Sequence, residues 1–349
     1  MLEKFINRLP KNVDGALIVS SENRRYFTGF DSSDGFLFAT RKGSVFLTDS
    51  RYIEAAENSI KCCAVEEQTA KLGEYAARFD CHALSVEADR LTVSQLKVLR
   101  KALNGVRLTT VGTDNLIDSF RAIKNEIETE NICKAQRIAE AAFEHILGYI
   151  KVGVTEKEIA LELDHYMLSH GAEGLSFETI AVSGANTSKP HGVPTDKKVE
   201  FGDFVTMDYG AVVNGYHSDM TRTVAVGTIN DEQKKIYNIV LQAQVATLER
   251  LKAGLKCSEA DSVSRNIIRD AGYGDFFRHS TGHGVGIEIH EKPNLSPKSA
   301  ATLQSGNVVT VEPGIYIPGN FGVRIEDMAL ITETGCKNLT KADKKLYVL

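Results

Sequence analysis

Four acidic residues in the C-terminal half of the chain are spaced in two similar pairs, which makes them candidates for a metal site. The pairs are Asp208 with Asp219 and Glu312 with Glu326. Carboxylates that converge on one site repel one another and raise one another's pKa values, so such a cluster is unfavourable without counter-ions. Two divalent cations would balance four carboxylates in charge. The sequence therefore predicts a centre for two divalent metal ions.

A single histidine completes the candidate ligand set. His283 lies in the run STGHGVG at residues 280–286, where the glycines allow a close approach of the backbone. A site rich in oxygen ligands with one imidazole suits manganese, cobalt or iron better than a cysteine and histidine cage does. We therefore expect two divalent ions per chain, manganese first, with cobalt, zinc or iron as the alternatives.

The expected chemistry is hydrolysis. Two metal ions about 3.5–4 Å apart can share a water molecule, lower its pKa towards neutrality and polarise a carbonyl group. His191, His279 and His290 lie near the acids in sequence, and an imidazole can donate a hydrogen bond to a developing oxyanion. A purely structural histidine is the alternative at each position. Arg324 shares a strand face with Glu326, where it could orient a carboxylate or bind a substrate terminus.

The first acid pair flanks a turn signal. Asn214-Gly215 strongly favours a two-residue hairpin turn, because both residues tolerate positive φ. A turn there pairs Val213 with Tyr216. Because side chains alternate between faces with period two, this register places Asp208 and Asp219 on one face, roughly 7–8 Å apart at the backbone, unless a bulge intervenes.

The second acid pair flanks a longer loop signal at residues 318–320. A three-residue loop centred on Gly319 puts Glu312 directly opposite Glu326. Gly322 leaves a longer or bulged loop open. Both acid pairs are thus predicted to lie on β-hairpins, each with its two carboxylates on one face.

The two hairpins belong to an internal repeat. The strand at residues 202–210 resembles the strand at residues 306–314, with Gly, Val-Thr, an acid and a final Gly at the same offsets. A helix precedes each strand: one is predicted to begin at a capping box of Thr155 and Glu158 and the other at Ser258 as N-cap. The pattern indicates a duplication, and a site fed by both repeats would lie where they pack together.

The chain as a whole predicts two domains, because its 349 residues exceed the usual size of one. Residues 15–20, 35–40, 44–49 and 83–89 favour strands, and residues 91–103 favour a helix. We place the boundary in the mixed, charged segment 114–131, which gives a mixed α/β domain over residues 1–122. Residues 123–349 form the second domain, beginning with a long amphipathic helix from about Ile132 to near Gly153.

Composition excludes several classes of protein. The net charge is −5 at pH 7 and the sequence has no basic stripe, so we do not expect a nucleic-acid-binding protein. No apolar run approaches the roughly 18 residues of a membrane span, and the first residues lack the apolar core of a secretory signal, so we expect a cytoplasmic protein. The six cysteines show no CxxC pair and are expected to be reduced and mostly buried.

These motifs resemble a known family. The set Asp208, Asp219, His283, Glu312 and Glu326, with PHG at 190–192, GHGVGIEIHE at 282–291 and VEPGIY at 311–316, is similar to the two-metal pita-bread aminopeptidases. That family includes methionine aminopeptidase, prolidase and aminopeptidase P. The resemblance covers about residues 125–349 and implies that the five residues hold the dinuclear metal site. It also implies an α+β chain whose C-terminal part is a pseudo-twofold pita-bread domain.

The N-terminal part of the chain resembles the proline-directed branch of this family. NRRYFTGF at 23–30 and TDSRY at 48–52 look like segments of the creatinase/prolidase N-terminal domain, which methionine aminopeptidases commonly lack. The resemblance implies that His191 and His290 bind substrate and stabilise the tetrahedral intermediate. His279 and Arg324 match positions used around the substrate. A homodimer is also implied.

The resulting hypothesis is an exopeptidase that cleaves small peptides between the N-terminal residue and a proline, by attack of a hydroxide bridging the two metals. Glu312 is a candidate proton shuttle as well as a ligand. The sequence leaves an Xaa-Pro dipeptidase and an Xaa-Pro aminopeptidase both open. A methionine aminopeptidase-like specificity and a non-catalytic, peptide-binding pita-bread protein are the alternatives.

Overall fold

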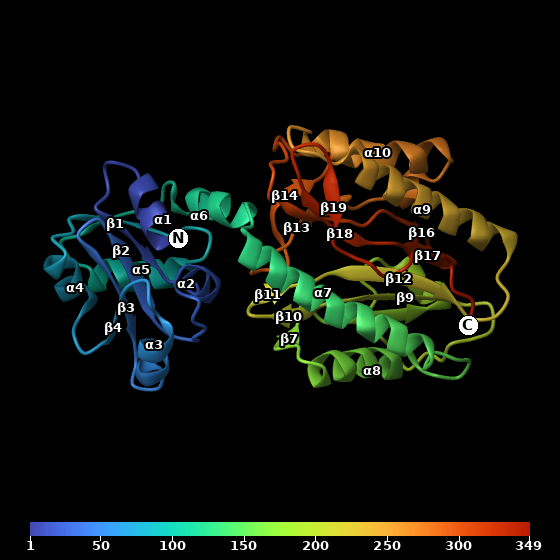
Figure 1. Cartoon of the computed structure of the whole chain (residues 1–349), viewed down its shortest axis with the longest axis horizontal. Coiled ribbons are helices and arrows are strands. Elements are labelled where there is room, and N and C mark those ends of the chain that lie inside the picture. Colours follow the sequence, from blue (N-terminus) through green and yellow to red (C-terminus); the bar gives the residue numbers. More distant parts are fainter. The chain divides into compact units, whose positions relative to one another are not determined.

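The computed structural model describes residues 1–349, which divide into two compact units, Met1–Arg121 and Ala122–Leu349. The division falls one residue before the boundary expected from the sequence. No helix in the structure combines the length and the apolar composition needed to cross a bilayer. Figure 1 labels the helices and strands of both units.

The first unit is built around one mixed sheet of six strands in the order β4-β3-β2-β1-β5-β6. Its elements are α1 (Leu2–Arg8), β1 (Gly15–Ile18), α2 (Ser21–Thr28), β2 (Phe36–Thr40), β3 (Gly43–Thr48), α3 (Ile53–Ser59), β4 (Ala64–Glu67), α4 (Leu72–Arg78), β5 (Ala83–Val86), α5 (Val93–Ala102), β6 (Arg107–Thr109) and α6 (Thr113–Ala122). All four strands and the helix predicted for this part are present.

The sheet of the first unit is buried on both faces. Neighbouring residues of β1, Leu17 and Ile18, belong to two separate apolar clusters, because side chains alternate between the faces. Cover on both sides explains why the inner strands β1, β2, β3 and β5 are mostly apolar, whereas the edge strands β4 and β6 are not. These clusters stabilise the unit as an independent core.

The second unit contains the repeat. Its elements are α7 (Glu126–Leu147), α8 (Glu156–Ser169), β7 (Gly174–Leu175), β8 (Ile180–Ser183), η1 (Gly184–Ser188), β9 (Phe204–Tyr209), β10 (Ala211–Val213), β11 (Tyr216–His217), β12 (Met220–Ala225), α9 (Asp231–Arg250), α10 (Cys257–Asp270), η2 (Gly274–Phe276), β13 (Gly282–Gly284), β14 (Glu291–Leu295), β15 (Val308–Val311), β16 (Gly314–Ile317), β17 (Phe321–Arg324), β18 (Asp327–Ile331) and β19 (Cys336–Asn338). Figure 1 shows the strands lying between the pair α7–α8 and the pair α9–α10.

Each helix pair covers its own repeat. Phe143 of α7 and Leu163 of α8 pack against Met207 of β9 in one cluster. Val240 of α9 and Val323 of β17 belong to another. The strands of both repeats are therefore held between two layers of helices.

Helix boundaries differ from the sequence prediction at three places. The segment expected as a charged boundary is mostly helical, because Asn125 and Glu128 form a capping box that starts α7 early. The same helix ends at Leu147, before the predicted end near Gly153. Thr155 caps α8 as predicted. Ser258 is not an N-cap: it lies inside α10, whose Cys257 N–H donates to the Ala301 carbonyl at 2.9 Å.

The first acidic hairpin has the predicted register. Val213 of β10 pairs with Tyr216 of β11 across the turn, and Asp208 of β9 pairs with Thr221 of β12. Asn214 and Gly215 both have positive φ, 50° and 77°, as the two-residue turn requires. The predicted register is confirmed on both sides of Gly210 and Asp219, where the ladder is interrupted and the two strand pairs belong to different sheets.

The second hairpin also has the predicted centre. Ile317 pairs with Phe321, and further along Val311 pairs with Asp327, so the loop has three residues around Gly319. The longer loop that Gly322 had left open is not formed.

The cysteines are less buried than expected. All six are free, but only Cys81 and Cys257 are buried, and Cys62 is exposed. The prediction of mostly buried thiols is therefore wrong. Cys62 is exposed because it lies in the short loop between α3 and β4, outside both apolar clusters of the first unit.

Candidate metal centre

One cavity of about 700 Å³ in the second unit is lined by every residue that the sequence analysis singled out for a site. The nine residues are Asp208, Asp219, His283, Glu312, Glu326, His191, His279, His290 and Arg324. They come from both repeats. The structure therefore brings the whole candidate set together.

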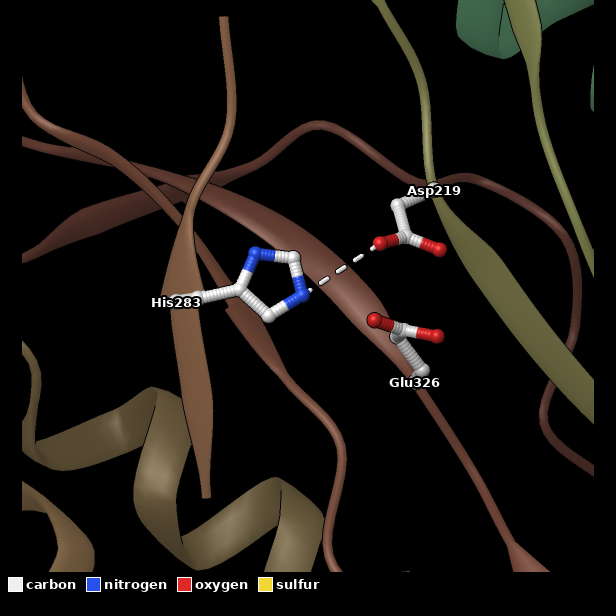
Figure 2. A group of neighbouring side chains, drawn as sticks. All are labelled: Asp219, His283 and Glu326. Atoms are coloured by element: carbon white, nitrogen blue, oxygen red, sulfur yellow. Dashed lines mark ion pairs between the residues drawn. The ribbon is translucent and has the colours of Figure 1, made fainter. Parts of the chain in front are cut away.

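Three of the predicted ligands form a tight group. One ligand atom from each of Asp219, His283 and Glu326 lies within 4.8 Å of the other two. Figure 2 shows the three side chains pointing toward one another. The His283 Nε2 atom lies 3.5 Å from Asp219 Oδ2 and 3.4 Å from Glu312 Oε1. Such spacing of donor atoms around a common point is what a shared cation needs.

The orientation of His283 is fixed by its backbone. Its Nδ1 atom lies 3.0 Å from the carbonyl oxygen of Gly284, which can only accept, so Nδ1 carries the proton. The Nε2 lone pair is then left facing the carboxylates. A Cβ on Gly282 would lie 1.9 Å from the Thr310 carbonyl oxygen, so only glycine fits beside this histidine.

Two threonines orient the glutamates. The Thr221 hydroxyl donates to Glu326 Oε2 at 2.7 Å, and the Thr310 hydroxyl donates to Glu312 Oε1 at 3.2 Å. Each glutamate therefore keeps one oxygen that no side chain of the protein occupies. This arrangement of supporting hydrogen bonds is typical of metal-binding carboxylates.

Asp208 has one satisfied and one unsatisfied oxygen. Its Oδ2 atom accepts from Arg324 Nη2 at 2.5 Å, whereas Oδ1 is buried and has no hydrogen-bond partner. A buried carboxylate oxygen without a partner is unfavourable, because it has lost its water and gained nothing. This atom therefore fits a missing ligand.

The acids are mutually destabilising as they stand. Burial raises the pKa of Asp219 and of Glu326 well above the usual range, and the neighbouring carboxylates raise it further. Burial also raises the pKa of Glu312 to about 8, although Arg324 opposes the shift. A divalent cation would reverse this by favouring the ionised forms. The donor set, the unpartnered oxygen of Asp208 and the crowded acids all fit divalent metal ions.

His279 is committed to a network behind the acids. Its Nδ1 atom donates to the Ser280 carbonyl at 2.8 Å, and its Nε2 atom accepts from the Tyr316 hydroxyl at 2.9 Å. Arg324 Nη1 donates to the same hydroxyl at 2.8 Å. Burial lowers the pKa of His279 to about 4, so the ring is neutral at pH 7. Both of its nitrogens are thus occupied by the protein.

The two remaining histidines border the acids. The ring of His290 lies 4.4 Å from the ring of His283, measured between centroids. Burial lowers the pKa of His290, and the nearby His283 lowers it further, so its neutral form is favoured. His191 is exposed on the cavity wall. Both can present a nitrogen to a molecule in the cavity.

Residues 130–333 match the model of metallopeptidase family M24, and residues 2–123 match the creatinase/prolidase N-terminal domain.

The chain belongs to metallopeptidase family M24.

Relatives of this M24 chain are similar over their full length. An Xaa-Pro dipeptidase of Pyrococcus horikoshii is 40% identical, with 99% of this chain and 98% of the relative covered. The solved structure of an Xaa-Pro dipeptidase from Bacillus anthracis is 40% identical with a TM-score of 0.96, and all of both chains is covered. An X-Pro aminopeptidase from Thermotoga maritima is 36% identical with a TM-score of 0.93, covering 100% of this chain and 99% of that one.

The M24 match confirms the family resemblance and the fold class. The chain is an α+β protein with a creatinase-type N-terminal domain and a pita-bread catalytic domain. Membership of a metallopeptidase family also means that divalent metal ions take part in its chemistry. The assignment of individual residues as ligands stays a prediction, supported by the geometry above.

Two residues of this M24 chain that support the site, Tyr316 and Thr221, were not predicted from the sequence. The register of the second hairpin contains a signal for Tyr316, since Gly314 pairs with Arg324 and Tyr316 lies diagonally across on the same face. The register of the first hairpin likewise places Thr221 opposite Asp208, but its contact with Glu326 of the other repeat has no local signal.

Proposed function

We propose that this M24 chain is a proline-directed exopeptidase that hydrolyses the bond between the N-terminal residue of a small peptide and a proline at the second position. Its relatives named as Xaa-Pro dipeptidase and X-Pro aminopeptidase support this specificity. The observation that carries the hydrolytic chemistry is the buried cluster of four carboxylates and one histidine in a single cavity.

We expect Asp208, Asp219, His283, Glu312 and Glu326 to hold two divalent ions, with manganese as the first choice. When bound, the ions supply an activated water molecule and polarise the carbonyl group of the scissile bond. The homodimer that the resemblance implies stays a prediction, which analytical ultracentrifugation of the purified chain tests.

The protein's own residues have separate roles in the proposed reaction. Glu312 would accept the proton of the attacking water and pass it to the leaving proline nitrogen. His191 and His290 would donate hydrogen bonds to the oxygen of the tetrahedral intermediate. Arg324 holds Asp208 in place. Because a peptide bond to proline has no N–H, the site cannot rely on that donor for binding.

A substrate panel tests the proposal. Metal-free protein is loaded separately with Mn, Co, Zn or Fe(II), and hydrolysis of Ala-Pro, Ala-Pro-Gly, Met-Ala-Gly and Ala-Ala-Gly is measured. We expect metal-dependent cleavage of the proline peptides alone, and the ratio of Ala-Pro to Ala-Pro-Gly separates a dipeptidase from an aminopeptidase. Preference for Met-Ala-Gly would replace the proposal with methionine aminopeptidase-like specificity. Peptide binding without cleavage would replace it with a binding function.

A further inference from the structure

One wall of the cavity is a short irregular segment, which we call the His191 strap and define as residues 184–194. Pro190, His191, Gly192, Val193 and Pro194 of the strap all line the cavity. It begins with the 3-10 turn η1 and otherwise lacks regular secondary structure. Since His191 and Val193 are exposed, packing of their own side chains does not hold them in place.

The two ends of the strap are joined by one buried carboxylate. Glu156, the first residue of α8, is 0% exposed. Its Oε1 atom accepts from the backbone N–H of Ser183 at 2.7 Å and from the Ser183 hydroxyl at 3.1 Å. Its Oε2 atom accepts from the N–H of Thr195 at 2.9 Å and from the Thr195 hydroxyl at 2.6 Å. Ser183 and Thr195 are the residues immediately before and after the strap.

A residue within the strap reaches the same carboxylate. The Asn186 amide lies 3.0 Å from Oε1 and 3.2 Å from Oε2 of Glu156, and it donates to them. Both oxygens are thus saturated by donors from the strap and its ends. Glu156 does not line the cavity, so its contacts serve the strap and not a bound molecule.

The middle of the strap is attached to the acid cluster from the other repeat. Arg324 Nη1 donates to the Pro190 carbonyl at 3.1 Å, and Arg324 also holds Asp208. The N–H of Gly322 donates to the Thr187 hydroxyl at 2.8 Å. The position of His191 relative to the acids therefore depends on Glu156 at the ends of the strap and on Arg324 and Gly322, which bind residues within it.

We propose that Glu156 is a positioning residue for peptide hydrolysis, which acts by closing the His191 strap so that His191 faces the reacting peptide. The proposal rests on the proposed function insofar as His191 contacts the substrate. Closing both ends of an exposed segment on one buried carboxylate limits the positions that its side chains can sample. Displacement of a catalytic group by about 1 Å can lower the rate by about a hundredfold.

A double-mutant cycle of Glu156→Gln and His191→Ala tests the proposal. Glutamine keeps the shape of the side chain but replaces one accepting oxygen by a donating NH₂, so the donors at one end of the strap lose their acceptor. We expect E156Q to lower kcat/KM by about tenfold to a hundredfold when His191 is present. In the His191→Ala background we expect the same substitution to change kcat/KM by less than about threefold, because coupled residues are not additive. The metal content of all four proteins should be equal.

Glu87→Gln is the matched control. Glu87 is also a glutamate that is 0% exposed, and it accepts from the Ser20 N–H at 3.0 Å and the Asn23 amide at 2.7 Å, all within the first unit. Glu87→Gln should lower the free energy of unfolding about as much as Glu156→Gln does and leave kcat/KM unchanged. Thr195→Val, which removes one hydroxyl donor and keeps the backbone N–H, is the milder variant should E156Q fail to fold, and it should show the same dependence on His191.

Two outcomes overturn the proposal. One is a loss from E156Q that multiplies with the loss from His191→Ala, and the other is a loss of bound metal in E156Q. Failure of the proposed function is distinguishable, because it appears in the unmodified protein as absent hydrolysis of proline peptides. The cycle is then measured on whichever peptide of the panel is hydrolysed or, without hydrolysis, on peptide affinity.

Discussion

Arg324 Nη2 lies 2.5 Å from Asp208 Oδ2 in a buried ion pair, and the second oxygen of Asp208 is left without a partner. The same guanidinium donates to Tyr316, to the Pro190 carbonyl and, through Nε, to the Thr221 hydroxyl at 3.0 Å. One arginine therefore connects a candidate metal ligand of the first repeat to the second hairpin and to the His191 strap. The planar fork of arginine suits this role, because it directs several donors at fixed angles.

Arg324→Gln should destabilise the metal-free protein, because it leaves the Asp208 charge buried and unpaired. We expect the free energy of unfolding to fall by about 3–5 kcal/mol, as measured by urea denaturation in the presence of a chelator. Metal affinity should also fall by about tenfold to a hundredfold. Arg324→Lys, which keeps the charge without the fork, should give an intermediate result. An unfolding free energy equal to that of the unmodified protein would show that the Arg324–Asp208 pair does not stabilise the metal-free protein.

Glu312→Gln should change how the stability of the metal-free protein depends on pH. The Glu312 carboxyl has a pKa raised from 4.5 to about 8, so its contribution is fully present below about pH 4.5 and is lost as pH rises through 8. Glutamine does not ionise, so E312Q should become progressively more stable than the unmodified protein between pH 5 and 8. Urea denaturation of both proteins with a chelator measures the difference. A difference that is constant with pH, or that shrinks, would contradict the expectation.

Asp219→Asn should separate activity from folding. Loss of a charged ligand is expected to lower kcat/KM by more than about a hundredfold, since even outer partners of metal ligands are worth about tenfold to a hundredfold. The metal-free variant should be as stable as the unmodified protein or more stable, because one member of a repelling cluster has become neutral. The exposed Asp343→Asn is the control, which should leave both quantities unchanged. Full turnover in D219N would exclude Asp219 from the site.

Tyr316→Phe should weaken the support of His279 and Arg324 together. Its hydroxyl accepts from Arg324 and donates to His279, so its removal leaves a buried Nε2 acceptor unsatisfied, at about 1–3 kcal/mol of unfolding free energy. We also expect kcat/KM to fall severalfold. Tyr237→Phe removes a comparable hydroxyl that donates to the Lys344 carbonyl at 3.2 Å, and it should lower stability without lowering kcat/KM. Equal kinetic effects of the two variants would contradict a special role for Tyr316.

The positions of the acids were predictable because hairpin geometry is local. Once Asn214-Gly215 and Gly319 set the turns, the period of two carries the register to Asp208 and Glu312 without tertiary information. The family and both of its domains were identified from motifs that lie close together in sequence. Local signals of this kind can be recognised from one sequence alone.

The supporting contacts were not predictable in the same way. Thr221 and Glu326 are 105 residues apart, and Glu156 and Thr195 are 39 apart, so no local period relates them. The start of α10 was misplaced for the same reason, since the N–H of its first residue, Cys257, donates to the distant Ala301 carbonyl. These hydrogen bonds and the start of α10 depend on residues that are distant in sequence, so short-range sequence patterns do not predict them.

The most direct test of the metal centre is an anomalous difference map from crystals of the protein grown with manganese. We expect two strong peaks per chain, lying between the side chains of Asp208, Asp219, His283, Glu312 and Glu326. Peaks confined to other parts of the chain, or the absence of any peak in crystals of protein that hydrolyses Ala-Pro-Gly, would contradict this expectation.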